Sequence, residues 1–148
     1  MAKTITGGLF GNPVRFYVEA AELPWVALTG GIALLYIVSY WLAGLDIMVM
    51  PPLVLILQVL GASLTAYLTG VREEATWAQT LIVCLLVGIA TGAVSALLAL
   101  FRFWYPWLIF NLVVEPVWSG LLAVAVGSVT ISFFHLPALL KRYKTFTS

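Results

Sequence analysis

Hydrophobic residues fall into four long stretches, which polar and turn-forming residues separate. The stretches cover roughly residues 25–44, 48–70, 79–101 and 117–136, and the third contains no charged residue. Each is close to the length of about 20 residues that a helix needs to cross the hydrocarbon core of a bilayer. The pattern predicts an all-α integral membrane protein. We expect residues 1–148 to form a single membrane domain with four transmembrane helices in an antiparallel bundle.

Small side chains recur at four-residue intervals in the third and fourth stretches. At about 3.6 residues per turn, residues four apart lie on one face of a helix. Small residues on such a face let two membrane helices approach closely. The predicted packing positions are Cys84, Gly88, Gly92, Ala96, Gly61, Ser119, Ala123 and Gly127. We expect these faces to pack inside the bundle and against other membrane subunits.

Residues 1–24, before the first stretch, have a different pattern. Asn12 and Pro13 are typical of a helix start, with Asn12 as the cap and Pro13 in the first turn. In the residues that follow, Arg15 and Glu19 lie four apart on a polar side. This pattern predicts a short amphipathic helix that lies in the headgroup region.

The segment between the third and fourth stretches allows two interpretations. Residues 102–107, RFWYPW, are dense in aromatic side chains and are typical of a belt at the membrane surface. Residues 108–116, LIFNLVVEP, are too short to cross a bilayer alone. They are either a re-entrant or interfacial segment or the first part of a long helix that is broken near Pro116.

The distribution of basic residues predicts the orientation. With four spans, one side receives six basic residues and the other receives only Arg102. Because basic residues favour the cytoplasmic side, we predict a plasma-membrane protein with both termini in the cytoplasm. The tail, residues 137–148, supplies three of the six. The predicted interface anchors are Trp25, Trp41, Trp104, Tyr105, Trp107, Lys141, Arg142 and Lys144.

Composition agrees with a membrane protein and excludes several classes of site. The 148 residues are 63% hydrophobic and 9% charged, whereas a soluble domain has about 25% charged residues. The net charge of +1 argues against nucleic acid as a partner. A single cysteine excludes an internal disulfide and a multi-cysteine metal site. A single histidine excludes a haem held between two histidines of this chain.

Three polar residues are candidates for a polar or ion site. Glu115 places a carboxylate beside a long apolar run, which is costly unless the group is paired, protonated or hydrated. It is either a proton or cation site or an interfacial carboxylate near Arg102. Asn111 lies four residues before Glu115 and would share its helix face. Gln58 is the strongly polar residue within the second stretch, and it suits hydrogen bonding between helices.

Other chemistry has little support in the sequence. His135 is a weak candidate for a cofactor ligand, and a local hydrogen bond is the simpler interpretation. The chain has no phosphate-binding glycine loop, no His-Glu-x-x-His helix and no nucleophile elbow. We therefore predict no catalytic residues, no metal site and no cofactor, and we expect bound lipid.

Two hypotheses for the function follow. The first is a non-catalytic accessory or structural subunit of a larger integral-membrane complex, packed through its small-residue helix faces. The second is a small homo-oligomeric transporter or channel with a polar path near Glu115, Asn111 and Gln58. No motif assigns the chain to a family.

Overall fold

The computed structural model describes residues 13–41, 48–72 and 74–146, and the side chains of residues 13–41, 48–71 and 74–135. In these residues all regular elements are helices. They are α1 (Val14–Ser39), α2 (Met50–Tyr67), the short π-helix η1 (Leu68–Arg72), α3 (Trp77–Phe103), the 3₁₀ helix η2 (Pro106–Phe110) and α4 (Asn111–Phe146). Four segments of these helices are long and apolar enough to cross a membrane. The predicted all-helical membrane class is therefore confirmed.

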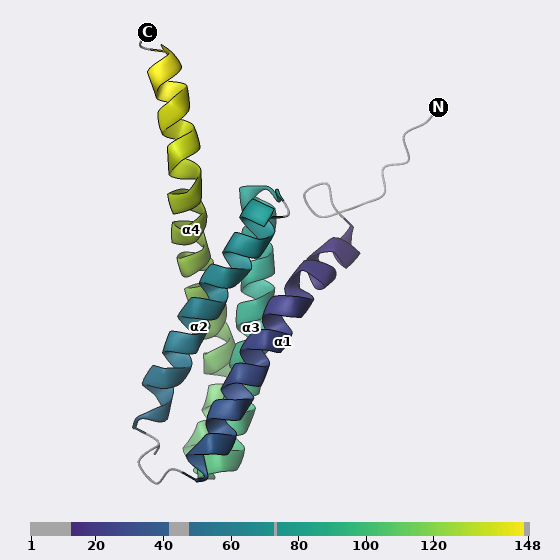
Figure 1. Ribbon diagram of the computed structural model, residues 1–148. Coiled ribbons are helices and arrows are strands. Elements are labelled where there is room, and N and C mark those ends of the chain that lie inside the picture. The colour runs from purple at the N-terminus through teal and green to yellow at the C-terminus, as the bar shows by residue number, and fades with distance from the viewer. Residues whose placement is uncertain (1–12, 42–47, 73, 147–148) are drawn as a thin grey trace, which may run out of the picture.

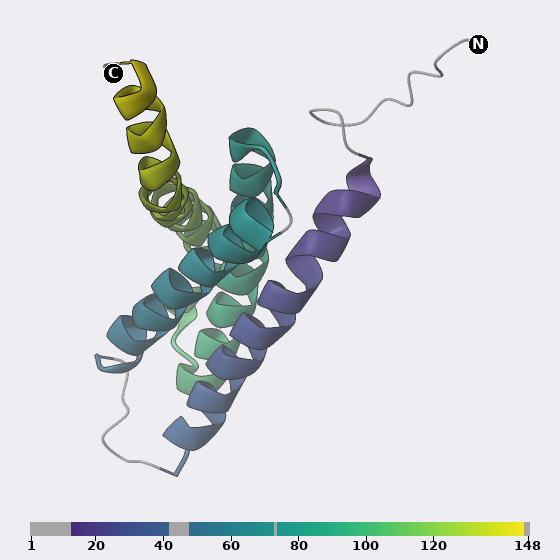
Figure 2. The same cartoon turned by 45° about the horizontal axis from the view of Figure 1, so that its top comes forward.

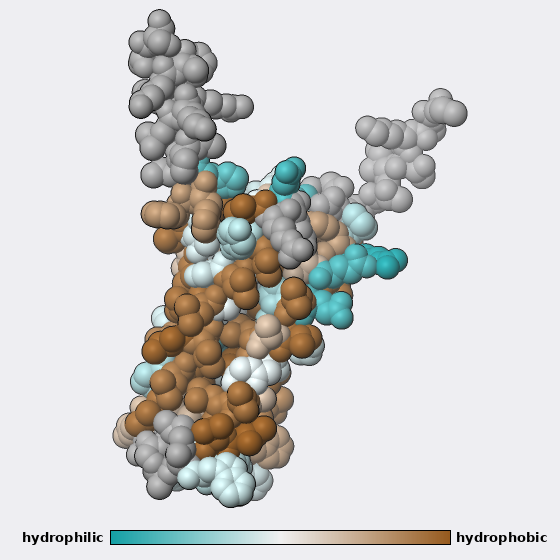
Figure 3. Space-filling model, in the orientation of Figure 1, coloured by the Kyte–Doolittle hydropathy of each residue, from teal (hydrophilic) through white to brown (hydrophobic). Residues whose placement is uncertain are grey.

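The chain runs down α1, up α2, down α3 and up α4 in the view of Figure 1. The last turns of α4 extend beyond the other helices, as Figures 1 and 2 both show. Most of the surface beside the bundle is hydrophobic, and hydrophilic residues gather towards one end (Figure 3). Many large apolar side chains are exposed on this surface, including Leu34, Leu60 and Val129. Such a surface suits contact with lipid.

A single helix, α1, takes the place of the expected interfacial helix and separate first span. It starts directly after Pro13 and continues through Pro24 to Ser39 without a break. A proline inside a membrane helix removes one backbone hydrogen bond, and neighbouring helices can compensate for that loss. Pro24 is buried in the bundle. Residues 14–24 therefore lead directly into the first span, and the predicted cap Asn12 lies outside the described residues.

Local sequence signals account for the starts of α2 and α3. Pro51 and Pro52 stand in the first turn of α2, where a missing amide hydrogen has little cost. At the start of α3, the Thr76 amide donates to Gln79 Oε1 at 2.8 Å and the Gln79 amide donates to Thr76 Oγ1 at 3.4 Å. This capping box satisfies donors that the helix start leaves unpaired. Helix α3 ends at Trp104, which has the left-handed φ of 54°.

Residues 111–114 belong to the start of a long helix, as the second of the two interpretations predicts, whereas residues 108–110 lie in η2. The turn η2 leads into α4 at Asn111, and α4 continues through Pro116. A re-entrant segment is not confirmed, and no break in the helix is assigned at Pro116.

The closest helix contact in the core lies between α3 and α4, where the two series of small residues meet. A Cβ added at Gly88 would lie 2.5 Å from the Ser119 carbonyl oxygen. A Cβ added at Gly92 would lie 2.7 Å from the Glu115 carbonyl oxygen. Both distances are too short for a real side chain, so the two backbones meet only because these residues are glycines.

Other members of the small-residue series also pack inside the chain. A Cβ added at Gly127 would lie 2.8 Å from Cys84 Sγ, and one added at Gly61 would lie 2.6 Å from a Leu28 methyl carbon. Ala96 and Ala123 are buried. The small-residue faces that were predicted to pack against other subunits therefore contact helices of this chain.

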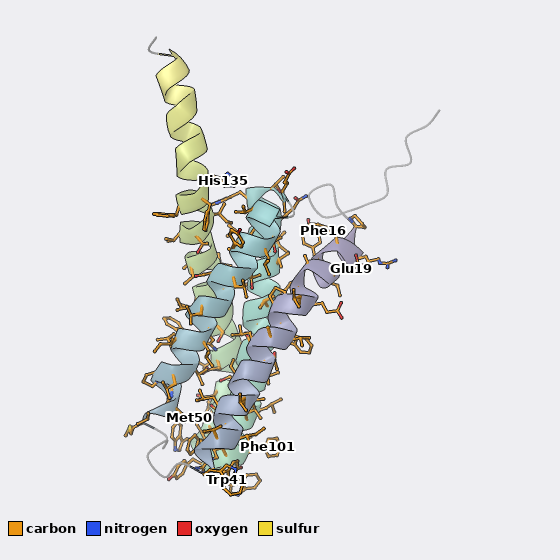
Figure 4. The ribbon with its side chains drawn as sticks, in the orientation of Figure 1. Phe16, Glu19, Trp41, Met50, Phe101 and His135 are labelled. Carbon is orange, nitrogen blue, oxygen red and sulfur yellow. The ribbon has the colours of Figure 1, made fainter. Side chains whose placement is uncertain are left out.

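Aromatic residues mark the end of the bundle at which α3 turns into α4. Trp41 is 85% exposed, and Trp104, Tyr105 and Trp107 are exposed as well. Figure 4 shows both Trp41 and Phe101 at this end. Trp25 lies within α1, on its exposed side. The side chains of the anchors Lys141, Arg142 and Lys144 lie outside the described part.

The close contact predicts a difference between two Gly→Ala substitutions. Gly88→Ala should lower the free energy of unfolding by about 1–3 kcal/mol, because the new methyl group meets the backbone of α4. Gly30→Ala should be neutral or slightly stabilising, because its Cβ would meet no neighbouring atom within 4 Å. Reversible unfolding of the purified protein in detergent measures both. Equal effects would contradict the described contact between α3 and α4.

Candidate functional site: a carboxylate in a polar cluster at the end of the bundle

Polar side chains from all four long helices meet near the aromatic end. Gln58 Nε2 of α2 donates to Ser119 Oγ of α4 at 2.8 Å, and this contact is buried. The Glu115 carboxylate lies near the polar side chains of Gln58 and of Ser95 from α3. Tyr36 of α1 lies near Ser95, and both residues line one cavity. We call these five residues the Glu115 cluster.

Two features of the backbone distinguish the position of Glu115. Pro116 follows it and has no amide hydrogen, so the Leu112 carbonyl loses its usual helical donor. Across the contact, Gly92 lets the α4 backbone at Glu115 approach α3. Ser95 lies about one turn after Gly92 on α3 and is 2% exposed. The cluster is therefore located where α3 and α4 are tightly packed.

A cavity of about 200 Å³ borders the cluster. Tyr36, Ser95, Asn111 and Glu115 supply its polar wall. Asn111 and Glu115, which the sequence placed on one helix face, both line it. Gln58 does not line the cavity, and its Nε2 donates to Ser119 Oγ. The remaining walls are apolar and aromatic side chains of α2, α3 and η2.

The cluster lies at a shallow depth in the bundle. At a rise of about 1.5 Å per residue, Glu115 is roughly 6 Å along α4 from its first residue, Asn111. Gln58 is roughly 12 Å along α2 from Met50. The carboxylate is therefore inside the helical region but near the exposed Trp41 and Trp107, and it is only half-buried.

Arg102, the cation expected near Glu115, has other partners. Its Nε donates to Ser39 Oγ at 2.9 Å, and a terminal guanidinium nitrogen donates to the Ser39 carbonyl oxygen at 3.0 Å. The guanidinium also lies 4.5 Å from the centre of the Tyr40 ring. These contacts join the ends of α1 and α3. Among the described residues, no cation forms a salt bridge with Glu115, and the polar side chains near it include those of Gln58 and Ser95.

The structure places Asn111 and Glu115 on one cavity with Gln58 near Glu115, but it leaves His135 apart. His135 is exposed and lies towards the opposite end of the bundle from Met50 (Figure 4). It is roughly 30 Å along α4 from Glu115, so the two cannot hold one small ligand. Within the described ranges, no group of three His, Cys, Asp or Glu residues could hold a metal ion. Cys84 is buried against the Ala62 carbonyl.

Sequence reasoning missed Tyr36 and Ser95. Ser95 directly precedes the predicted packing position Ala96. Its position beside the series of small residues could therefore have indicated it. Tyr36 resembled an ordinary aromatic residue of the first span, and only the packing of α1 against α3 shows that it reaches the cluster.

Comparisons with known protein families, with curated proteins and with solved structures found no match. The site is therefore the basis for inferring a function.

The hydrogen bond between Gln58 and Ser119 predicts a measurable coupling. A double-mutant cycle of Gln58→Leu and Ser119→Ala should give a coupling free energy of about 0.6 kcal/mol, and at most about 1.7 kcal/mol. Unfolding in detergent supplies the four values. In the control cycle, Ser119→Ala is replaced by Ser132→Ala, because the Ser132 hydroxyl donates to its own helix. That control should show no coupling, and coupling of the same size in both cycles would contradict the contact.

Proposed function

We propose that the chain is a small integral-membrane transporter or channel for a cationic solute, and that its path includes Glu115, Asn111 and Gln58. The observation that carries the proposal is the half-buried Glu115 carboxylate, which lines a cavity and has neutral polar side chains near it. An ionisable group within a membrane helix is costly and by default marks a functional site. A carboxylate whose partners are neutral remains able to balance a positive charge.

Every long helix contributes a polar side chain to the Glu115 cluster, and this supports the same proposal. A carboxylate that only marked the membrane surface would need water as its partner. Glu115 instead meets Gln58 and Ser95, and Ser95 connects to Tyr36. Helices that could bury apolar residues at these positions carry polar ones, at a cost in stability.

The proposal includes an orientation in the plasma membrane. We place four antiparallel spans with both termini in the cytoplasm, as the basic residues favour. The cavity then opens on the non-cytoplasmic side, near Arg102. At the other side, the exposed pair of Arg15 and Glu19 on the first turns of α1 lies in the headgroup region.

The rest of the path is proposed to need a second copy or a movement of the helices. Further along the bundle, the buried hydroxyls of Thr65 and Thr91 donate to carbonyl groups of their own helices. Neither residue lines the cavity. A homo-oligomer, in which copies share a path, meets this requirement.

The carboxylate predicts a specific loss of transport. Glu115→Gln should reduce cation uptake into proteoliposomes by at least about tenfold, because the amide keeps the hydrogen-bonding shape but removes the charge. Glu22→Gln is the matched control, since Glu22 is an exposed carboxylate of α1 outside this cavity. Unchanged uptake in the Glu115 variant, with correct folding, would refute the proposal.

An accessory subunit of a larger membrane complex is the second candidate, and one observation favours it. A Cβ added at Gly30 or Gly31 of α1 would meet no neighbouring atom within 4 Å among the described residues. This pair of glycines leaves room for a helix of another chain to approach α1 closely.

The native assembly distinguishes the two candidates. If the transporter proposal is correct, purification of the tagged protein from its native membrane in gentle detergent should give a particle made of copies of this chain. Particle mass and the identity of co-purifying chains are the readouts. A large particle of several different chains, disrupted by Gly30→Leu, would instead establish the accessory role.

A further inference from the structure

We infer that the ligand of the Glu115 cavity is a small organic cation, such as an alkylated ammonium, and not a metal ion or a proton alone. The inference deepens the proposed function and rests on it, because both use the Glu115 carboxylate. It depends on three properties of the cavity: its volume, its aromatic walls and its single formal charge.

The volume exceeds what a bare ion needs. The cavity measures about 200 Å³, whereas one water molecule takes about 30 Å³ in the liquid. A metal ion or a proton would leave most of this space to water. Much of that water would face apolar walls that offer no hydrogen bond, including Met50, Val54 and Leu108, all of which are buried. A ligand with alkyl groups fills the same space and matches those walls.

Aromatic residues line the cavity on several sides. They are Tyr36 from α1, Phe103 from the end of α3 and Trp107 from η2. The rings of Tyr36 and Phe103 lie 6.5 Å apart in an edge-to-face arrangement. Trp107 is 55% exposed, which places it at the opening. Several aromatic rings around one carboxylate are the arrangement that recognises alkylated ammonium groups through cation–π attraction.

The charge balance favours one positive charge on the ligand. Glu115 is the ionisable acid among the described residues that line the cavity. A divalent ion at this site would keep an unbalanced positive charge near hydrocarbon, and Ca²⁺ further prefers six to eight oxygen ligands. A monovalent ammonium is neutralised by one carboxylate. Asn111 and Ser95 add neutral polar groups that suit a hydroxyl or an N–H on the ligand.

Binding of radiolabelled choline to the full chain in lipid nanodiscs tests the inference. Choline is the probe because 3,3-dimethyl-1-butanol has nearly the same shape without the charge. We expect saturable choline binding that excess tetramethylammonium displaces. The neutral alcohol should compete at least about tenfold more weakly, because it gains neither the carboxylate nor the cation–π contact. Na⁺, K⁺ and Mg²⁺ at equal concentration should not displace the label.

Two variants and two controls connect the binding to this cavity. Glu115→Gln should weaken choline binding by at least about tenfold through the loss of the charge. Trp107→Leu should weaken it about two- to fivefold, as expected for an exposed cation–π contact. Trp118→Leu, an exposed tryptophan of α4 that does not line the cavity, and Glu22→Gln should bind like the original chain. If Glu115→Gln does not fold, the comparison of Trp107→Leu with Trp118→Leu decides.

The outcomes separate this inference from the proposed function. Saturable choline binding that depends on Glu115 and Trp107 supports both. If choline does not bind while Na⁺, K⁺ or proton uptake depends on Glu115, the organic-cation inference is overturned and the transport proposal stands. If neither choline binding nor any cation uptake depends on Glu115, both are overturned. If the neutral alcohol displaces choline as well as tetramethylammonium does, the inference is overturned, because the site then recognises the shape of the ligand and not its charge.

Discussion

The close approach of α3 and α4 determines where the other groups of this protein lie. In a membrane, apolar side chains gain little by leaving lipid for protein, so helices associate through van der Waals contact and hydrogen bonds. Gly88 and Gly92 let the α3 backbone reach the α4 backbone at Ser119 and Glu115. No larger residue at these two positions fits the observed distance. The remaining helices pack around this pair.

The same contact creates the site. Because Gly92 opposes Glu115, the carboxylate enters the interior next to Ser95, one turn further along α3. Ser119, one turn further along α4, then meets Gln58 from α2. The hydrogen bonds that offset part of the cost of a charge in this region are therefore a consequence of helix packing. The polar groups also fix how α2 is rotated about its axis, since Gln58 reaches Ser119 in one orientation only.

The sequence alone was sufficient for the class of fold and for the faces that pack. Four apolar stretches and a low content of charge leave few alternatives to four membrane helices. Gly88 and Gly92 were recognisable by spacing, and Asn111 and Glu115 by their position on one helix face. These signals are local, because they depend on the period of the helix and on residue size.

Features that depend on contacts between helices could not be predicted from the sequence. Arg102 and Glu115 have opposite charges and were expected on one side, yet Arg102 binds Ser39 at the end of α1. An interfacial helix before residue 25 and a separate first span were expected, but α1 continues through the buried Pro24. Tyr36 had no signal at all, since its role depends on Ser95 of another helix. In each case a partner distant in the chain decides the outcome.

The location of the small residues weakens the support for the accessory-subunit hypothesis. A series of glycines and alanines argues for a partner subunit only if it lies on a free face. Gly88, Gly92 and Gly127 instead meet residues of this chain, so they cannot also bind another subunit. What remains unexplained by packing is the interior carboxylate, because alanine or leucine at position 115 would suit a purely structural helix better. The functional question therefore moves from the outer surface of the bundle to the cavity beside Glu115.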